Sequence, residues 1–243
     1  MLSRIRGFRG YITSRGLFWI GVAFVVWVLV LSGVREWRRV LAERQRVEDD
    51  MRLQLRILSA TISTETTRGR VAEYIHKSSR GKLDPQQCVL VSGAVMDAHT
   101  LYNLDVSLCL ALLEVESGFD PRSRSATNAL GLAQVLPSTA RPYLRLLQAR
   151  SGLRAEDHLM DPDTCTRVGL AYLADLRDSF TVTPPPVRNP VNGVDPVLYY
   201  SVVAYNIGET AARERFSHGA YTLGYADSVF TIQRRIRESG GPE

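Results

Sequence analysis

The feature that most constrains this chain is an uninterrupted apolar run near its N-terminus. Residues 16–34, GLFWIGVAFVVWVLVLSGV, carry no charged side chain. As a helix with a rise of 1.5 Å per residue, these nineteen residues span nearly the ~30 Å hydrocarbon core of a bilayer. The run is longer than the 7–15 apolar residues of a cleaved signal peptide, and no A-x-A-like cleavage site follows it. The sequence therefore predicts one uncleaved transmembrane helix.

Charge on the two sides of this run predicts its orientation. Residues 1–15 contain four arginines and no acidic residue, whereas after the run arginines are interleaved with acidic residues. Because arginine and lysine favour the cytoplasmic side, we expect a cytoplasmic basic tail and a single pass through the inner membrane. The rest of the chain would then be translocated to the periplasmic side. Without the tail the chain is nearly neutral, so its net charge of +5 does not indicate a nucleic-acid partner.

Residues 35–83 are predicted to form a helical spacer followed by a linker. Between residues 34 and 62, apolar side chains recur at alternating steps of three and four, interrupted by Arg44 and Glu48. Two interpretations remain open: a short parallel coiled coil for self-association or an envelope-machine partner, or an amphipathic spacer on a neighbouring surface. Ser, Thr and Gly after residue 62 predict a linker around a short helix at 71–76.

The folded domain is predicted to occupy residues 84–236 and to be mainly α, with a tail at 237–243. Asp-Pro pairs at Asp84, Asp161 and Asp195 are typical of helix starts. No segment shows the period-2 alternation expected of a strand. Five prolines in residues 181–196 predict a long loop.

Cysteine and histidine give no sign of a metal site. The three cysteines have no C-x-x-C spacing, and the four histidines lack partners at metal-ligand spacing. Cys109 is expected in the core of a helix. Cys88 and Cys165 remain as a possible disulfide pair in an oxidising compartment.

Two glutamates end an otherwise apolar segment, DVSLCLALLEVESG, with Asp105 as its expected N-cap and Gly118 as its C-terminal stop. At helical spacing, Glu116 continues the apolar stripe, whereas Glu114 is 200° away around the helix. The two carboxylates are therefore expected to point to different sides. A carboxyl group among apolar neighbours is pushed towards its neutral form, as a general acid requires at neutral pH.

The residues after Glu116 form the blocks of a known family. Residues 116–140, ESGFDPRSRSATNALGLAQVLPSTA, resemble the catalytic signature of the lytic transglycosylases, the SLT domain related to goose-type lysozyme. Typical members read E-S-x-F-x-P, then S-x-x-G-A-x-G-L-M-Q, then P-x-T-A. The matching positions are Glu116, Ser117, Phe119, Pro121, Ser125, Ala129, Gly131, Leu132, Gln134, Pro137, Thr139 and Ala140.

Three later blocks agree in order, so the resemblance covers residues 84 to about 236. Their matching positions are Asp161, Pro162, Gly169, Tyr172, Leu173, Ala204, Tyr205, Asn206, Gly208, Thr222, Tyr225 and Val229. Four positions depart from the family: Asn128 replaces Gly, Ala133 replaces Met, Cys165 replaces Asn and Tyr221 replaces Glu. Loss of a Met from the cleft wall and of a Glu from its far side is expected to change how a glycan is gripped.

The resemblance implies a lysozyme-like domain that cleaves the β-1,4 bond between N-acetylmuramic acid and N-acetylglucosamine in peptidoglycan. It implies Glu116 as the single catalytic residue, first acid and then base, with formation of a 1,6-anhydro ring and with no metal or cofactor. By position, Ser125, Gln134, Tyr205 and Asn206 would bind the sugars. Tyr205 is further expected to lie near enough to Glu116 to hydrogen-bond to it.

Two other functions are compatible with these residues. A muramidase would cut the same bond with water and would use Asp120 or Glu114 as a second carboxylate. A catalytically silent peptidoglycan-binding module would keep the fold and the anchor without the reaction. The intact Glu116 favours an enzyme.

Overall fold

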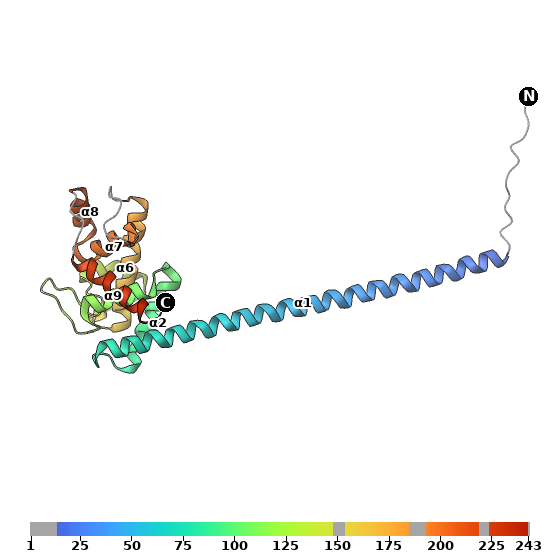
Figure 1. The fold of residues 1–243 in the computed structure, drawn as a ribbon, viewed down its shortest axis with the longest axis horizontal. Coiled ribbons are helices and arrows are strands. Elements are labelled where there is room, and N and C mark those ends of the chain that lie inside the picture. The colour runs from blue at the N-terminus through green and yellow to red at the C-terminus, as the bar shows by residue number, and fades with distance from the viewer. Residues whose placement is uncertain (1–13, 148–153, 185–192, 219–223, 243) are drawn as a thin grey trace, which may run out of the picture. The chain divides into compact units, whose positions relative to one another are not determined.

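The secondary structure of the described chain is helical (Figure 1). The computed structural model describes residues 14–147, 154–184, 193–218 and 224–242. Apart from helices, it contains within these ranges the isolated bridges Arg124–Leu130 and Leu130–Val135. The predicted mainly α class is confirmed. The helices are α1 (Ser14–Ser79), α2 (Pro85–Tyr102), α3 (Val106–Ser117), α4 (Pro137–Leu146), α5 (Ala155–Leu159), α6 (Pro162–Val182), α7 (Pro196–Ile207), α8 (Glu209–Ser217) and α9 (Gly224–Glu238).

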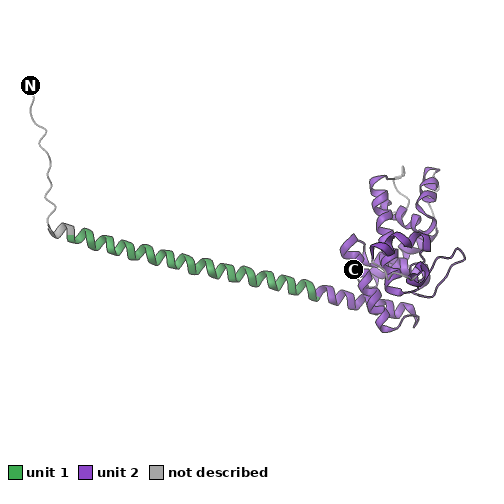
Figure 2. Cartoon of the chain, turned by 180° about the vertical axis from the view of Figure 1, so that it is seen from behind, with its two compact units in different colours: residues 1–62 green, residues 63–243 purple. Residues whose placement is uncertain are grey.

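The chain divides into two compact units, residues 1–62 and residues 63–243 (Figure 2). In the first unit, α1 includes the predicted transmembrane segment, whose apolar side chains from Phe18 onward are exposed apart from Leu31, which is partly exposed. By length and composition, α1 is the helix within the described part of the chain that could cross a membrane. The basic tail that the sequence predicts lies, up to residue 13, outside the described residues.

The helix predicted over residues 34–62 is part of α1, and its apolar stripe is exposed along its length. The stripe consists of Val34, Trp37, Leu41, Met51, Leu55, Leu58 and Ile62. Isolated helices owe little of their stability to propensity, and an amphipathic face is normally covered by packing. The coiled coil and the surface spacer both remain predictions for what covers it.

The linker predicted after residue 62 is wrong. Here α1 continues without a break to Ser79, and the second unit begins at Ser63 rather than near Asp84. Val71 and Ile75 are fully buried, and this packing offsets the low helix propensity of the Ser, Thr and Gly residues. The helix ends where Arg80 and Gly81 adopt positive φ angles, a conformation that favours glycine.

At the centre of the second unit lies α3, which packs against α2 and α9. Its residues from Val106 to Leu113 are all buried, which matches the unbroken apolar run in the sequence. Around it, α6 packs on α2 and α7, and α7 also contacts α9. The helix that carries the two glutamates is therefore the core helix of the domain, and only its last turn approaches solvent.

Side-chain caps fix the helix ends that the sequence predicted. Asp105 accepts a hydrogen bond from the Leu108 amide at 2.9 Å, and Gly118 ends α3 in the left-handed conformation. Asp84, Asp161 and Asp195 likewise cap α2, α6 and α7. Of the proline-rich loop predicted at 181–196, residues 185–192 lie outside the described ranges.

All three cysteines are buried and free. Cys109 lies in the core of α3, as predicted. The possible Cys88–Cys165 disulfide is not formed. Burial raises the pKa of the Cys165 thiol to about 12, so it is an unreactive packing residue at neutral pH.

The segment predicted as a C-terminal tail contacts the folded unit. Arg70 of α1 donates hydrogen bonds to the carbonyl oxygens of Gly240 and Gly241, at 2.7 and 2.8 Å. The residues after α9 are thereby fastened to the first helix of the second unit.

Candidate active site

Glu116 lies on the last turn of α3, where the buried stripe of that helix reaches the surface. Its side chain is half-buried, and burial raises its pKa to about 7. A hydrogen bond from Tyr225 acts in the opposite direction but does not outweigh the loss of solvation. A large part of this carboxyl group is therefore protonated at neutral pH, which is the state required of a general acid.

Tyr225, at the start of α9, donates its hydroxyl proton to Oε1 of Glu116. Burial and the nearby carboxylate raise the pKa of Tyr225 well above its usual range, so it keeps this proton at neutral pH. Tyr225 matches a family block in the sequence, but the sequence assigns it no role. Tyr225 and Glu116 are 109 positions apart in the sequence. A sequence match to a family block does not show which residues lie close together in space.

The hydrogen bond to Glu116 that the sequence assigned to Tyr205 is not the one found. The Tyr205 hydroxyl, on α7, donates instead to the Ala133 carbonyl at 2.8 Å, and its ring lies 5.3 Å from that of Tyr172. The single hydroxyl proton of Tyr205 is therefore donated to Ala133 and not to Glu116. Glu116 is still close, because its charge is among the causes that raise the pKa of Tyr205.

The loop between α3 and α4 is tied to both neighbouring helices. Ser117 at the end of α3 donates to the Leu132 carbonyl at 2.8 Å. The Ala133 amide donates to Sγ of Cys165 on α6 at 3.4 Å, so this thiol contacts loop backbone at the position where the family has Asn. A Cβ atom on Gly131, which has φ +71°, would lie 2.0 Å from the Leu159 carbonyl oxygen, which leaves room for glycine alone.

Two predicted sugar-binding residues shape this loop. Gln134 has a positive φ, and its side-chain nitrogen donates to the carbonyls of Ser123 and Gly131 at 3.1 and 2.9 Å. Ser125 accepts from the Ala129 amide at 2.9 Å. The carbonyl oxygen of Gln134 remains as an acceptor for a ligand. Another predicted sugar-binding residue, Asn206, is exposed at the end of α7.

The family departures have different structural consequences. Asn128, in place of Gly, has φ +67°, a conformation that Asn tolerates better than most residues. Ala133 is fully buried and faces α6. A Cβ atom added to Gly169 of α6 would lie only 2.4 Å from the Cβ atom of Ala133. The expected effect of this departure on how a glycan is gripped stays a prediction. Tyr221 lies outside the described residues.

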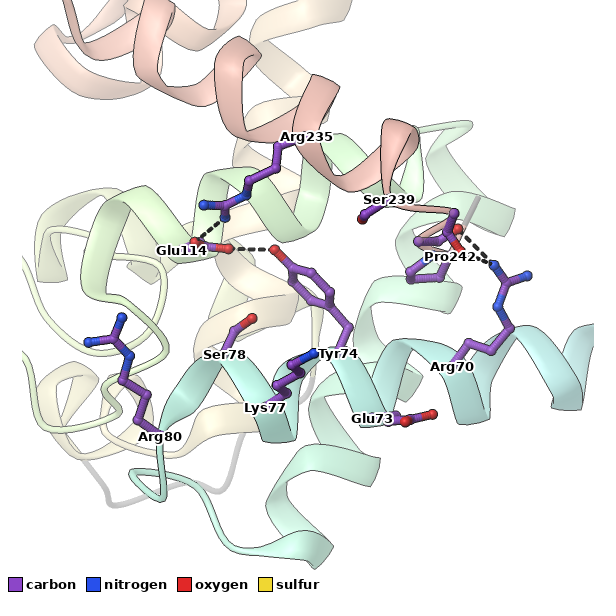
Figure 3. A pocket seen from close by; sticks show the side chains of 12 residues that line it. Arg70, Glu73, Tyr74, Lys77, Ser78, Arg80, Glu114, Arg235, Ser239 and Pro242 are labelled. Atoms are coloured by element: carbon purple, nitrogen blue, oxygen red, sulfur yellow. Dashed lines mark hydrogen bonds and ion pairs between the residues drawn. The ribbon is translucent and has the colours of Figure 1, made fainter.

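The two glutamates point to different sides of α3, as expected. Glu114 accepts a hydrogen bond from Tyr74 of α1 and forms an ion pair with Arg235 of α9 (Figure 3). Asp120 accepts from the Arg122 amide at 2.9 Å and lies 3.9 Å from the Lys82 ammonium group. Both carboxylates that a muramidase could use are thus engaged with partners other than Glu116. Within the described ranges, His, Cys, Asp and Glu side chains form no group of three suited to a metal ion.

Comparison with known proteins identifies the domain. A family model described as the Transglycosylase SLT domain matches residues 94–223, just over half of the chain. Two relatives, both named membrane-bound lytic murein transglycosylase C, come from Mannheimia succiniciproducens and Actinobacillus succinogenes. They are 34% and 33% identical over 122 and 123 residues, which is 50% and 51% of this chain. The matches cover 32% of each relative, so the chain spans about a third of their length.

Solved structures of proteins named as lytic transglycosylases are similar at lower identity. An inactive mutant of lytic transglycosylase Slt from Pseudomonas aeruginosa is 20% identical, with a TM-score of 0.47, over 62% of this chain and 24% of that one. The 70 kDa soluble lytic transglycosylase of Escherichia coli gives the same two values over 72% of this chain and 30% of its own. On the match of the family model, the resemblance found in the sequence is confirmed: the chain belongs to the Transglycosylase SLT domain family.

Proposed function

We propose that this protein is a membrane-anchored lytic transglycosylase of peptidoglycan. It would cleave the β-1,4 bond between N-acetylmuramic acid and N-acetylglucosamine. One observation carries the proposal: Glu116, the family's glutamate, has its pKa raised to about 7 by burial and bears a hydrogen bond from Tyr225. Membership of the SLT family supports the same activity.

In the first step, protonated Glu116 donates its proton to the glycosidic oxygen while the bond from that oxygen to the anomeric carbon of the muramoyl residue breaks. The N-acetylglucosamine part leaves as an alcohol. The oxygen of the substrate's own 2-acetamido group supports the positive charge that develops on the anomeric carbon. A second protein carboxylate is not required for this step.

In the second step, the Glu116 carboxylate removes the proton from the C6 hydroxyl of the muramoyl residue. The C6 oxygen bonds to the anomeric carbon and closes the 1,6-anhydro ring, and Glu116 returns to its protonated state. An intramolecular hydroxyl competes well with water, because effective molarities on the order of 10⁵ M or more are reached when groups are well oriented. The protons balance without a metal or cofactor.

This chemistry is favoured over hydrolysis by the surroundings of the other two carboxylates. Glu114 is paired with Arg235 on another side of α3, and Asp120 is engaged in its own turn and near Lys82. A hydrolase would need a second carboxylate about 5–9.5 Å from Glu116 and free to act as base or nucleophile. One general acid with a substrate hydroxyl meets the requirement with the groups available.

Sugar binding is proposed for the loop between α3 and α4 and for the end of α7. The free acceptor of Gln134, the hydroxyl of Ser125 and the exposed amide of Asn206 are suited to hydroxyl and N-acetyl groups. Tyr205 would act indirectly, by holding the Ala133 carbonyl and with it the loop.

Residues 16–34 are proposed to anchor the protein in the inner membrane, with the N-terminus inside and the domain on the periplasmic side. The stripe between residues 34 and 62 is proposed to contact a second copy of the same helix, which a shared membrane would hold in parallel. Oxidative cross-linking of Leu55→Cys, on the stripe, should give a covalent dimer, whereas Asp50→Cys, off the stripe, should not. Equal cross-linking by both variants would point to chance collision, and none by either would favour a different envelope partner.

The activity is tested by mass spectrometry of the products that the full chain, in detergent, releases from purified peptidoglycan. Muropeptides one water lighter than hydrolysis products, absent with Glu116→Gln, are the expected result. Hydrated reducing ends would instead identify a muramidase, and Asp120→Asn would then test for the second carboxylate. If the peptidoglycan stays intact but sediments with the protein, the result would favour the catalytically silent binding module.

A further inference from the structure

A second carboxylate on the last turn of α3 has no part in the proposed reaction. Glu114 lies two residues before Glu116, and its side chain is only 20% exposed. It lines a pocket of about 520 Å³ formed by the C-terminal part of α1, by Arg235 on α9 and by the residues that follow α9 (Figure 3). A carboxylate this far from solvent needs hydrogen-bond and charge partners to offset its lost hydration.

Both partners of Glu114 come from distant parts of the sequence. The Tyr74 hydroxyl, on α1, donates to Oε2 at 2.5 Å, and Nη2 of Arg235, on α9, donates to Oε1 at 2.5 Å. In Figure 3 the two side chains reach Glu114 from different helices. Glu114 is therefore the point at which α1, α3 and α9 are joined through one side chain.

Helix α9 contacts both glutamates. Tyr225 at its start donates to Glu116, and Arg235 near its end pairs with Glu114. Because Gly224–Glu238 is a single helix, its two ends move together. A shift of α9 that follows from loss of the Arg235 pair is therefore expected to displace the Tyr225 hydroxyl from Glu116.

The last turn of α3 is also held by residues at and after the end of α1. The ring of Tyr74 packs edge-on against Phe119, with centroids 6.4 Å apart. Lys82 donates to the Gly118 carbonyl at 3.2 Å. The backbone around Glu116 is thus fixed by the same segment that supplies the Tyr74 hydroxyl to Glu114.

We propose that Glu114 is a positioning residue that fastens α1 and α9 to the turn carrying Glu116 and thereby sets the direction of the Glu116 carboxyl group. The inference rests on the proposed function, because it concerns the placement of its general acid. Glu114 touches no substrate in this scheme. A displacement of α1 would reach the catalytic carboxyl through the Tyr74–Glu114 bond and the turn that it holds.

The test compares kcat and KM of the full chain, in detergent, on soluble glycan strands. Glu114→Gln, Tyr74→Phe and Arg235→Gln should each lower kcat by about tenfold with KM within about twofold, since misplacing a reacting group by 1 Å costs up to about 100-fold. Arg235→Lys, which keeps the charge, should recover part of the loss. The matched control is Arg167→Gln, which removes the 2.6 Å pair between α6 and Asp97 of α2 and should leave kcat unchanged.

A double-mutant cycle with Tyr225→Phe tests the route of the effect. If Glu114 acts through the Tyr225–Glu116 bond, Glu114→Gln should cost less than about twofold when Tyr225 is already Phe. Losses that simply multiply would overturn the proposal, as would a Glu114→Gln enzyme with the kcat of the control.

A substrate-free measurement separates this inference from the proposed activity. The ¹³Cζ resonance of Tyr225, assigned with Tyr225→Phe, reports the hydrogen bond to Glu116. It should move in Glu114→Gln and Tyr74→Phe but not in Arg167→Gln. If the Tyr225 resonance does not move in these variants, the positioning role of Glu114 is rejected even if the enzyme cleaves glycan. A moved resonance in a protein that leaves peptidoglycan intact would keep the role and reject the activity.

Discussion

The two sides of the last turn of α3 give two glutamates opposite environments. Glu116 faces Tyr225 among apolar neighbours, and burial raises its pKa to about 7. Glu114, two residues before it, forms an ion pair with the guanidinium of Arg235 and accepts a hydrogen bond from the phenol of Tyr74. The same side chain on the same turn is thus suited to proton transfer on one side and, as proposed, to positioning on the other. The environment of each glutamate is set by the neighbouring side chains that α1 and α9 contribute, rather than by α3 itself.

Replacing Glu116 itself is expected to change activity more than any other substitution on this turn. Glu116→Gln should lower peptidoglycan cleavage by about 10³-fold, because it removes a general acid that contributes 10²- to 10⁴-fold. The rate of product release on soluble glycan strands measures it. An activity within tenfold of wild type would mean that another group supplies the proton.

The next effect is on stability, with opposite signs for the two residues. Because the folded-state pKa of Glu116 lies above its unfolded value, ionising it costs the folded state free energy as pH rises from about 4.5 to about 7. Glu116→Gln should therefore raise the free energy of unfolding by about 3 kcal/mol at pH 8 and hardly at pH 4. Glu114→Gln should lower it at pH 8, because the Arg235 ion pair is lost. Urea unfolding at pH 4 and pH 8 measures both changes. A change in the free energy of unfolding with the same sign for both variants at pH 8 would contradict the comparison.

Removing the Tyr225 hydroxyl tests the surroundings of Glu116 alone, because this hydroxyl donates to Glu116. Tyr225→Phe should reduce kcat by about tenfold through lost orientation. The hydrogen bond lowers the pKa of Glu116, so without it the pKa rises further. The fall in activity at alkaline pH, where the acid loses its proton, should then move to higher pH. A pH–rate profile of kcat/KM displaced to lower pH would show that Tyr225 does not stabilise the carboxylate.

The smallest effect is expected at Lys82, which touches the turn shared by both glutamates. Its ammonium group is partly exposed and donates to the Gly118 carbonyl at 3.2 Å. Lys82→Met should cost no more than about 0.5 kcal/mol, because exposed charged contacts are screened by water. Thermal unfolding and kcat measure it; a kcat loss as large as that of Glu114→Gln would shift the positioning role to Lys82.

The sequence predicted the parts of this site that depend on local rules. Asp105 and Gly118 marked the ends of α3, and helical spacing placed Glu116 on the stripe and Glu114 away from it. The Tyr225 contact could not be derived in this way, because it depends on how α9 packs on α3. The same holds for Tyr74, which the sequence placed in a short helix within a linker.

Tertiary packing also explains the two local errors. Helix α1 was expected to stop after residue 62, since its Ser, Thr and Gly residues favour loops when nothing covers them. Burial of Val71 and Ile75 reverses that preference. Tyr205 was expected to serve Glu116 because the family block contains it, but a phenol has one proton and the Ala133 carbonyl receives it.

The two hydrogen bonds from Arg70 to the carbonyls of Gly240 and Gly241 have a mechanical consequence. Arg70 precedes Tyr74 by one helical turn, so a pull along α1 would reach these bonds before it reaches Glu114. Part of the load would then pass into the residues that follow α9 and, because α9 is a single helix, towards Tyr225 at its other end. In an enzyme tethered at one end and bound to a polymer at the other, Arg70 would thus carry part of the tension into the helix that contacts Glu116.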